Sequence, residues 1–125
     1  FDDGHYAALR IVEIILNSDM SISELVKNLP KSYSTPELNI TVTDETKFSI
    51  IENFAAQCSL DGDKKTIDGL RVNFKNGWGL IRASNTTPKL VLRFEGDTLK
   101  DMNSIKDEFI SELSRICPEI EINLD

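Results

Sequence analysis

One short segment of the chain brings together several side chains that can bind an anion. Residues 77–88 read GWGLIRASNTTP, so an arginine, a serine, an asparagine and two threonines follow an apolar run and end at a proline. Arg82 offers a planar pair of N–H donors to two oxygens of a phosphate, and Ser84 and Thr86 offer hydroxyl donors that rotate. This grouping predicts a phosphate-binding turn between two strands.

Further groups complete the predicted anion site. Asn85 offers an amide NH2, and the backbone N–H groups from Ala83 to Thr87 are expected to curl toward one centre as a nest. The small side chain of Ala83 lets the backbone approach a tetrahedral ligand, and Pro88, which has no N–H, ends the donor series. The alternative is an ordinary polar connection, because serine, asparagine, threonine and proline are also common in loops that bind nothing.

The segment lies in a long stretch without carboxylates. Residues 69–94 carry five basic side chains and no acidic one, whereas the rest of the chain carries 9 basic and 21 acidic side chains. Most of the surface is therefore expected to repel a phosphate and this stretch to attract it. The net charge of −7 argues against nucleic acid or an anionic membrane as the partner, since these require an extended basic face.

Length and cysteine content limit the class of protein further. With 125 residues, 40% of them hydrophobic, the chain is expected to build one sizeable core plus a small appended element. Cys58 and Cys117 lack a metal-ligand spacing and are predicted to be buried thiols in a reducing compartment, with a disulfide as the alternative. No stretch resembles a membrane span or a signal peptide, so the protein is expected to be soluble and cytoplasmic. Because the first residue is Phe1, we expect a part of a longer protein, although a processed terminus would look the same.

The first quarter of the chain is predicted to be helical. Apolar side chains recur at helical spacing over residues 5–17, behind Asp2 and Asp3 as candidate N-caps. Residues 21–24 (SISE) have the sequence of a capping box and begin a second short helix that ends at Pro30. Residues 31–37 contain two serines, a threonine and a proline and are predicted to be a linker. We therefore expect a helical segment with its linker at 1–33 and a separate domain at 34–125.

The second part is predicted to be an α+β domain. Alternating apolar and polar side chains predict four strands, at residues 38–43, 66–74, 78–82 and 89–94. The second of these is expected to be interrupted or preceded by a turn at Asp68-Gly69. Asn76-Gly77 predicts a hairpin between the second and third of these. Apolar side chains at helical spacing predict helices at 45–58, which would bury Phe48, and at 99–117. The expected fold is an antiparallel sheet of about four strands with two helices packed on one face.

Residues 78–95 (WGLIRASNTTPKLVLRFE) resemble the phosphate-binding loop and flanking strands in the C-terminal domain of the α-D-phosphohexomutases. Residues 1–4 (FDDG), 34–40 (STPELNI) and 68–72 (DGLRV) fit the same family, and the resemblance is to its bacterial phosphomannomutase/phosphoglucomutase type. It implies a C-terminal fragment that contains the end of the third domain and the whole fourth domain, the latter with a TATA-box-binding-protein-like fold.

Members of this family are four-domain enzymes that interconvert hexose 1-phosphate and hexose 6-phosphate through a bisphosphorylated sugar, with a phosphoserine and Mg²⁺. The resemblance implies partners, namely mannose or glucose 1- or 6-phosphate and the remaining domains of the same chain. It implies neither a catalytic residue nor a Mg²⁺ site within these 125 residues. The residues implied to bind the substrate phosphate are Arg82, Ala83, Ser84, Asn85 and Thr86.

Several other residues allow two interpretations. Thr87 stands where many relatives, including those that act on glucosamine phosphate, have Glu; this favours the mannose/glucose type and leaves the role of Thr87 open. Residues 61–63 (DGD) resemble a metal loop superficially but are expected to form a solvated turn. His5, the only histidine, is expected at the surface or as a cap. Trp78 is expected to pack in the core, with sugar stacking as the alternative. For the whole chain, the alternative function is a free-standing phosphosugar-binding module without catalysis.

Overall fold

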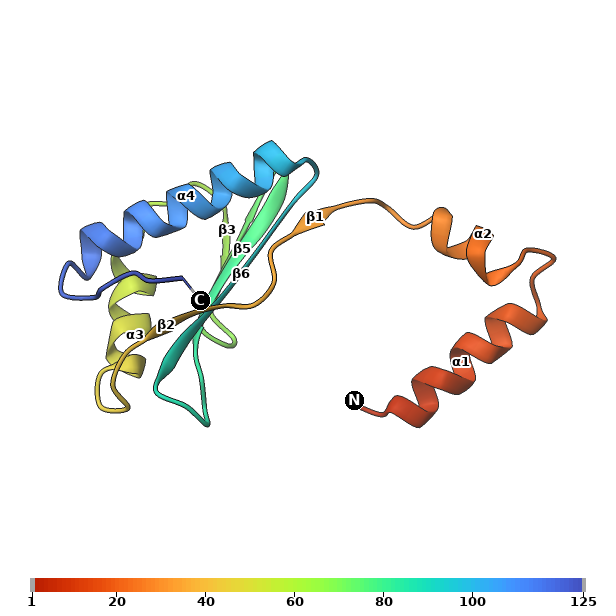
Figure 1. The fold of residues 1–125 in the computed structure, drawn as a ribbon, viewed down its shortest axis with the longest axis horizontal. Helices are drawn as coiled ribbons and strands as arrows, with labels where there is room; N and C mark the ends of the chain where they lie inside the picture. Colours follow the sequence, from red (N-terminus) through yellow and green to blue (C-terminus); the bar gives the residue numbers. More distant parts are fainter. Residues whose placement is uncertain (1, 125) are drawn as a thin grey trace. The chain divides into compact units, whose positions relative to one another are not determined.

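The computed structural model describes residues 2–124 and divides the chain into two units, Phe1–Lys31 and Ser32–Asp125. The first unit contains two helices and the second a sheet with two helices. Figure 1 shows these elements. The division falls shortly before the predicted boundary at residue 33, because Tyr33 and Ser34 form a short strand of the sheet. That the two units belong to two domains of a longer enzyme stays a prediction.

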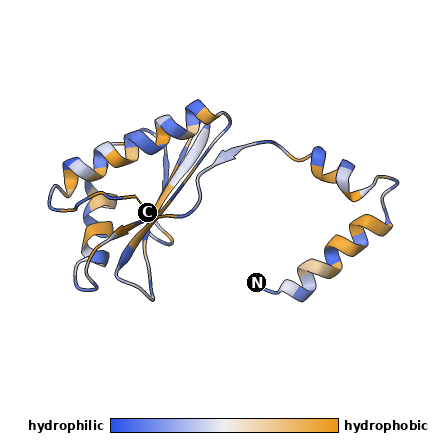
Figure 2. Cartoon of the chain, viewed as in Figure 1, coloured by the Kyte–Doolittle hydropathy of each residue, from blue (hydrophilic) through white to orange (hydrophobic). Residues whose placement is uncertain are grey.

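The first unit consists of α1 (Gly4–Leu16) and α2 (Ile22–Lys27). The carboxylate of Asp3 accepts a hydrogen bond from the Tyr6 backbone N–H at 2.9 Å, so Asp3 is the N-cap of α1. The predicted capping box of α2 is formed by Ser21 and Glu24, each of which accepts the other's backbone N–H. No described residue of this unit is buried, and α1 carries exposed apolar residues, whose positions are orange in the ribbon of Figure 2. An amphipathic helix normally covers such side chains against a neighbouring surface.

The second unit is built on a six-stranded antiparallel sheet. Its strands are β1 (Tyr33–Ser34), β2 (Leu38–Thr41), β3 (Asp63–Lys65), β4 (Leu70–Phe74), β5 (Gly77–Ala83) and β6 (Lys89–Gly96). They lie in the order β1-β6-β5-β4-β3, and β2 also pairs with β6. The predicted α+β class with an antiparallel sheet is confirmed. The expected number of about four strands was too low, because β1 and β3 contain only two and three residues and are too short to show alternation.

Helices α3 (Lys47–Gln57) and α4 (Leu99–Ile116) cover one face of this sheet, as predicted. Helix α3 packs on β4 and β5, and α4 packs on β5 and β6. Phe109 of α4 lies at the centre of the core, with its ring 5.9 Å from that of Phe54 and 5.4 Å from that of Phe94. A Cβ atom at Gly79 would lie 2.4 Å from the Phe109 ring, so the close contact between α4 and β5 depends on this glycine.

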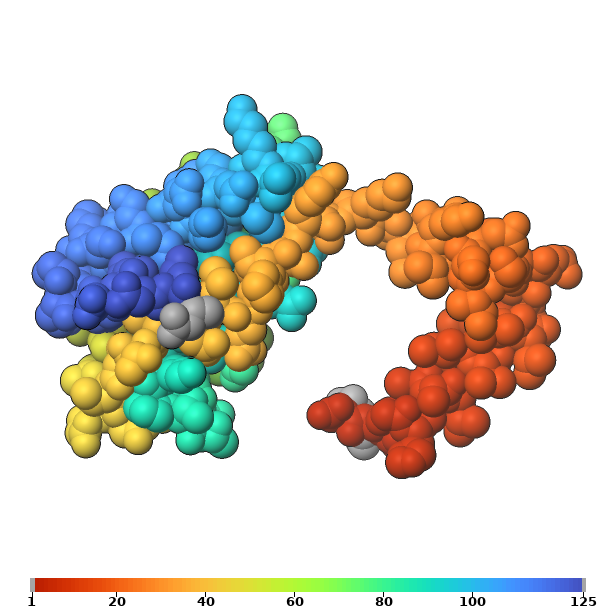
Figure 3. Space-filling view, viewed as in Figure 1, coloured from red at the N-terminus to blue at the C-terminus, as the bar shows by residue number. Residues whose placement is uncertain are grey.

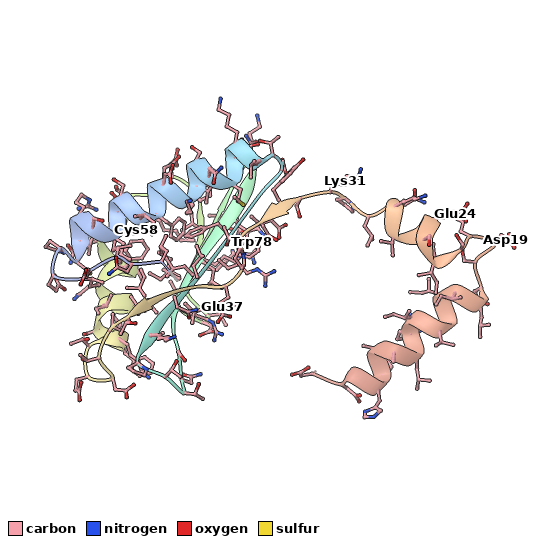
Figure 4. The ribbon with its side chains drawn as sticks, viewed as in Figure 1. Asp19, Glu24, Lys31, Glu37, Cys58 and Trp78 are labelled. Carbon is pink, nitrogen blue, oxygen red and sulfur yellow. The ribbon has the colours of Figure 1, made fainter. Side chains whose placement is uncertain are left out.

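Helices α3 and α4 leave the other face of the sheet open, and Trp78 lies on it. Trp78 pairs with Asn73 and Glu95 across the neighbouring strands and is half-buried (Figure 4). The Arg71 guanidinium stacks 4.1 Å from the centre of its ring. The prediction of core packing for Trp78 was therefore wrong. Side chains alternate along β5, and the place beneath Phe109 belongs to the next residue, Gly79.

The prediction that Phe48 is buried was also wrong. Phe48 is 51% exposed, because α3 begins at Lys47 and presents Lys47 and Phe54 to the core. The strand predicted within residues 66–74 begins at Leu70, so the Asp68-Gly69 turn precedes the strand, which is one of the two alternatives given above. Gly69 has φ +74 and turns the chain immediately before it.

Both cysteines are buried free thiols, and the alternative of a disulfide is not formed (Cys58 is labelled in Figure 4). Burial raises the pKa of the Cys117 thiol, which keeps that group protonated at neutral pH. His5 is exposed in α1. Within residues 2–124, no helix combines the length and the apolar character that a bilayer span requires.

Glu112 ties α4 to the segment that follows α3. Its carboxylate accepts hydrogen bonds from the backbone N–H and the hydroxyl of Ser59, at 2.8 and 3.0 Å, and from Arg115 at 2.8 Å. These bonds, that from Arg115 first, favour the ionised form and lower the pKa of Glu112 to about 2.

We predict that Glu112 makes the free energy of unfolding depend on pH in acid. Its pKa is lower in the folded chain, so its contribution is complete above its ordinary pKa of 4.5 and is lost as the pH falls toward about 2. The unaltered chain should therefore lose more stability over this range than Glu112→Gln, by about 1 kcal/mol. Urea unfolding at a series of pH values measures this. Glu108→Gln, an exposed site on the same helix, is the control, and parallel curves for the unaltered chain and Glu112→Gln would contradict the prediction.

Candidate phosphate-binding site

The predicted anion-binding residues lie at the end of β5 and in the loop of residues 84–88 that leads into β6. Both ends of this loop are held by the sheet. Ala83 pairs with Leu90, and the Ser84 N–H donates to the Lys89 carbonyl at 2.9 Å. In Figure 3 the loop (teal) projects from the second unit beside the segment between β2 and α3 (yellow).

The Ser84 hydroxyl is the centre of the loop. Its Oγ accepts hydrogen bonds from the Thr87 hydroxyl at 2.8 Å, the Thr87 N–H at 3.2 Å and the Thr86 N–H at 3.4 Å. A hydroxyl oxygen has two lone pairs and one proton, so its acceptor capacity is fully used. What Ser84 can still add is the donation of its own proton, for which a phosphate oxygen is a suitable acceptor.

The predicted backbone nest is not formed in this conformation. The N–H groups of Thr86 and Thr87 donate to Ser84, and that of Ser84 itself donates to Lys89. Thr87, whose role the sequence left open, therefore braces the loop from within. An anion would meet side-chain donors first, and the two threonine N–H groups only after they leave Ser84.

Arg82 lies on the open face of the sheet, two residues before Ser84 along the strand, with its side chain 34% exposed. Its Nη1 lies 3.4 Å from Oδ2 of Asp68, a long ion pair. Gly69 permits this approach, because a Cβ atom there would lie 2.2 Å from the Ile81 carbonyl oxygen. Residues 69–94 contain no carboxylate, but the carboxylate of the preceding residue, Asp68, lies beside Arg82 in the folded chain. A phosphate would compete with Asp68 for Arg82.

Ala83 and Asn85 line a hollow of about 270 Å³ beside the loop, together with Phe48 and Asp68. The Ala83 side chain is 7% exposed and faces the helices, whereas the Arg82 side chain lies on the open face. Asn85 and Thr86 are exposed near the tip of the loop. The structure therefore brings all five predicted residues to one end of the sheet, with Ala83 and Asn85 at the hollow and Arg82 on the open face.

Two charged residues outside the predicted set, Lys47 and Asp68, also contact this site. Lys47 is 4% exposed and donates to the Thr87 carbonyl at 3.3 Å. A signal was present, because Lys47 stands at helical spacing from the buried residues Ile50, Ile51 and Phe54, and a cation in an apolar stripe indicates a buried partner. Asp68 precedes Gly69, and this pair was interpreted only as a turn.

The described residues do not fit a metal site. Among residues 2–124 there is no group of three or more His, Cys, Asp or Glu side chains that could hold a metal ion. Asp63, one of the two carboxylates considered above, begins β3 and pairs with Lys65 at 3.1 Å. No step that involves Mg²⁺ is therefore derived from this segment.

Comparison with known protein families identifies the class of protein. Residues 37–112 match the family described as "Phosphoglucomutase/phosphomannomutase, C-terminal domain". This range begins just before β2, contains the whole loop of residues 84–88 and ends within α4. The chain belongs to the phosphoglucomutase/phosphomannomutase family.

Individual relatives agree with this assignment. The chain is 49% identical, over 98% of its length, to a phosphomannomutase/phosphoglucomutase of Pseudomonas putida, of which it covers 27%. It is 50% identical, over 87% of its length, to a phosphoglucomutase of Neisseria meningitidis serogroup B, of which it covers 24%. The crystal structure of a phosphoglucomutase/phosphomannomutase family protein from Burkholderia thailandensis matches 99% of the chain with a TM-score of 0.82 and 39% identity, and the chain covers 26% of it. The chain thus spans about a quarter of the length of these proteins.

We predict that Ser84→Ala frees the backbone N–H groups of Thr86 and Thr87. Both lose their acceptor, so their exchange with solvent should become about tenfold faster, which NMR amide-exchange rates would measure. Ser114→Ala is the control, because the Ser114 hydroxyl donates to a carbonyl within α4 and should leave the loop unchanged. Equal exchange rates in the unaltered chain and Ser84→Ala would show that other contacts hold the loop.

Proposed function

We propose that the chain is the C-terminal part of a phosphomannomutase/phosphoglucomutase that interconverts hexose 1-phosphate and hexose 6-phosphate. Its task in this proposal is to bind the phosphate group of the substrate and to help close the active site. The family to which the chain belongs supports this activity. The observation that carries the binding role is the Ser84 hydroxyl, whose oxygen is held by Thr86 and Thr87 and whose proton is available to an anion near Arg82.

Each residue of the proposed site has a distinct role. Arg82 supplies charge and two parallel N–H donors, Ser84 and Thr86 supply hydroxyl donors, and Asn85 supplies an amide donor. Ala83 contributes small size rather than a donor. Each neutral hydrogen bond contributes only about 0.5 to 1.5 kcal/mol net, so the phosphate can be held by several bonds and released in steps. A site that must hold one end of a bisphosphorylated sugar and then let it turn requires this property.

The chemical steps and Mg²⁺ belong, in this proposal, to other domains of the same chain, which are its partners. The ligands proposed are mannose and glucose 1- and 6-phosphates, and neither nucleic acid nor a membrane is proposed as a partner. A cytoplasmic location forms part of the same proposal. It is supported by the two buried free thiols, Cys58 and Cys117, which a reducing compartment preserves.

We predict that the 125-residue chain binds glucose 6-phosphate weakly, with a Kd of about 1 mM or higher, because it holds only one end of the ligand. The amide NMR shifts should centre on residues 82–87, and Arg82→Ala should abolish them. Arg93→Ala is a matched control, since it removes the same charge from the same open face of the sheet, on β6 opposite Leu80. Shifts that centre elsewhere, or that persist in Arg82→Ala, would contradict the assignment.

The same variant tests the proposed activity in the full-length enzyme. Charge-assisted bonds contribute about 1.5 to 3 kcal/mol, so Arg82→Ala should lower kcat/KM for glucose 1-phosphate roughly tenfold to a hundredfold. Ser84→Ala should lower it less. A full-length Arg82→Ala enzyme with unchanged kcat/KM would remove the phosphate-binding role from this loop.

A further inference from the structure

Lys47 is a buried cation at the start of α3, and the proposed function does not use it. It is 4% exposed and faces the core in the same stripe as Ile50 and Phe54. Burying an ammonium group is costly unless partners replace the lost water. The groups that contact the Lys47 ammonium therefore indicate what this residue does in the fold.

Those partners lie on two segments. The ammonium lies 2.7 Å from a carboxylate oxygen of Asp44, and it donates to the Thr87 carbonyl at 3.3 Å. The Phe48 ring, with its centre 5.2 Å from the same nitrogen, adds a cation–π contact. Asp44 is 65% exposed, so its carboxylate is well hydrated without help from the lysine. The second contact, from the Lys47 ammonium to the Thr87 carbonyl, joins α3 to the loop of residues 84–88, and water does not readily replace it.

Thr87 connects Lys47 with the centre of the loop. Its carbonyl accepts from Lys47 and from the Lys89 N–H, while its own hydroxyl and N–H donate to Ser84. A second bond joins the same segments, because the Val42 N–H donates to the Pro88 carbonyl at 3.0 Å. The segment between β2 and α3 thus holds the arm of the loop that leads into β6, and Figure 3 shows the two segments side by side.

We propose that Lys47 is a positioning residue for phosphate binding. Its ammonium fixes the Thr87 carbonyl, and through Thr87 it keeps the Ser84 hydroxyl in the orientation that directs a proton toward the ligand. This inference rests on the proposed function of the loop. Lys47 is not a ligand contact itself, because its ammonium is directed at Thr87 and Asp44.

A positioning role can be separated from a merely structural one. Removing one partner of an ion pair destabilises a fold when the other charge is left buried and unpaired. Here Asp44 is 65% exposed and the Thr87 carbonyl keeps the Lys89 N–H as a donor, so loss of the ammonium strands no buried charge. Lys47→Met keeps most of the stem and removes the ammonium. If Lys47 positions the loop, this variant weakens phosphate binding while the fold stays as stable as before or becomes more stable.

The test compares Lys47→Met with Lys64→Met in the 125-residue chain, with glucose 6-phosphate as the probe. Lys64, on β3, donates to the Cys58 carbonyl, so the control loses the same charge and the same kind of bond away from the loop. Lys47→Met should keep or raise Tm, shift the amide signals of Ser84 and Thr87 before ligand is added, and raise the Kd about three- to tenfold. The rise should persist at high salt, where a long-range charge effect would be screened. Lys64→Met should leave the Kd unchanged.

Each other outcome overturns the inference. An unchanged Kd in Lys47→Met, with binding lost in Arg82→Ala, refutes the positioning role and leaves the proposed function intact. A rise in Kd that is accompanied by a fall in Tm shows that Lys47 only supports the fold. Binding that survives in Arg82→Ala refutes the proposed function, and the inference with it.

If Lys47→Met does not fold, an NMR measurement on the unaltered chain tests the inference instead. The ¹⁵N-labelled ammonium group of Lys47 should give an NMR signal that moves when glucose 6-phosphate binds, because the Thr87 carbonyl is its acceptor. A signal that stays in place at saturating ligand overturns the inference.

Discussion

The register of β5 against β6 is the constraint on which the rest of the second unit depends. The last pair of this register is Ala83 with Leu90, and the Ser84 N–H donates to the Lys89 carbonyl just beyond it. These contacts set the length of the loop between the two strands. The same two strands carry the core residues under α4, and β6 also pairs with β1 and β2. A slip of one residue would turn Arg82 into the core and Ala83 onto the open face, so the hydrophobic core enforces the geometry of the loop.

Side chains alternate between the two faces of β5, so the residues that pack in the core and the arginine proposed to bind phosphate lie on opposite faces. Gly79, Ile81 and Ala83 face the helices, and the first of these allows Phe109 to approach the sheet closely. Arg82 faces the other way and needs no helix to hold it. The core can therefore be packed tightly while the side chain proposed to bind phosphate stays accessible, and the loop begins after Ala83, the last buried residue of β5.

Local signals in the sequence were sufficient to predict much of the fold and the position of the loop that carries the candidate site. Residues 70–74 and 78–82, with Asn76-Gly77 between them, predicted the hairpin, and the donors of residues 82–86 predicted the loop. The wrong or missing predictions concerned two things: which face of a strand is buried, and which residues far apart in the sequence contact each other. Alternation alone does not say which face of β5 is buried, so Trp78 was placed wrongly. The bonds from Lys47 to Thr87 and from Arg82 to Asp68 join residues 40 and 14 positions apart, and no local pattern specifies such partners. The backbone nest failed for a related reason, since Ser84 accepts the N–H groups that were expected to face a ligand.

The internal bonds of the loop also determine how a phosphate would be held. Arg82 has Asp68 as a partner, and Thr86 and Thr87 have Ser84, so a phosphate that uses these donors exchanges bonds instead of adding them. The net gain is then the difference between two sets of hydrogen bonds and is smaller than the gross strength of either. Asp68 also reduces the attraction of Arg82 for an anion, because a carboxylate beside the arginine repels a dianion that approaches it. A loop built in this way would hold one end of the proposed phosphorylated sugar firmly only when other contacts hold the rest of the molecule, which fits a chain that covers about a quarter of the proteins it matches.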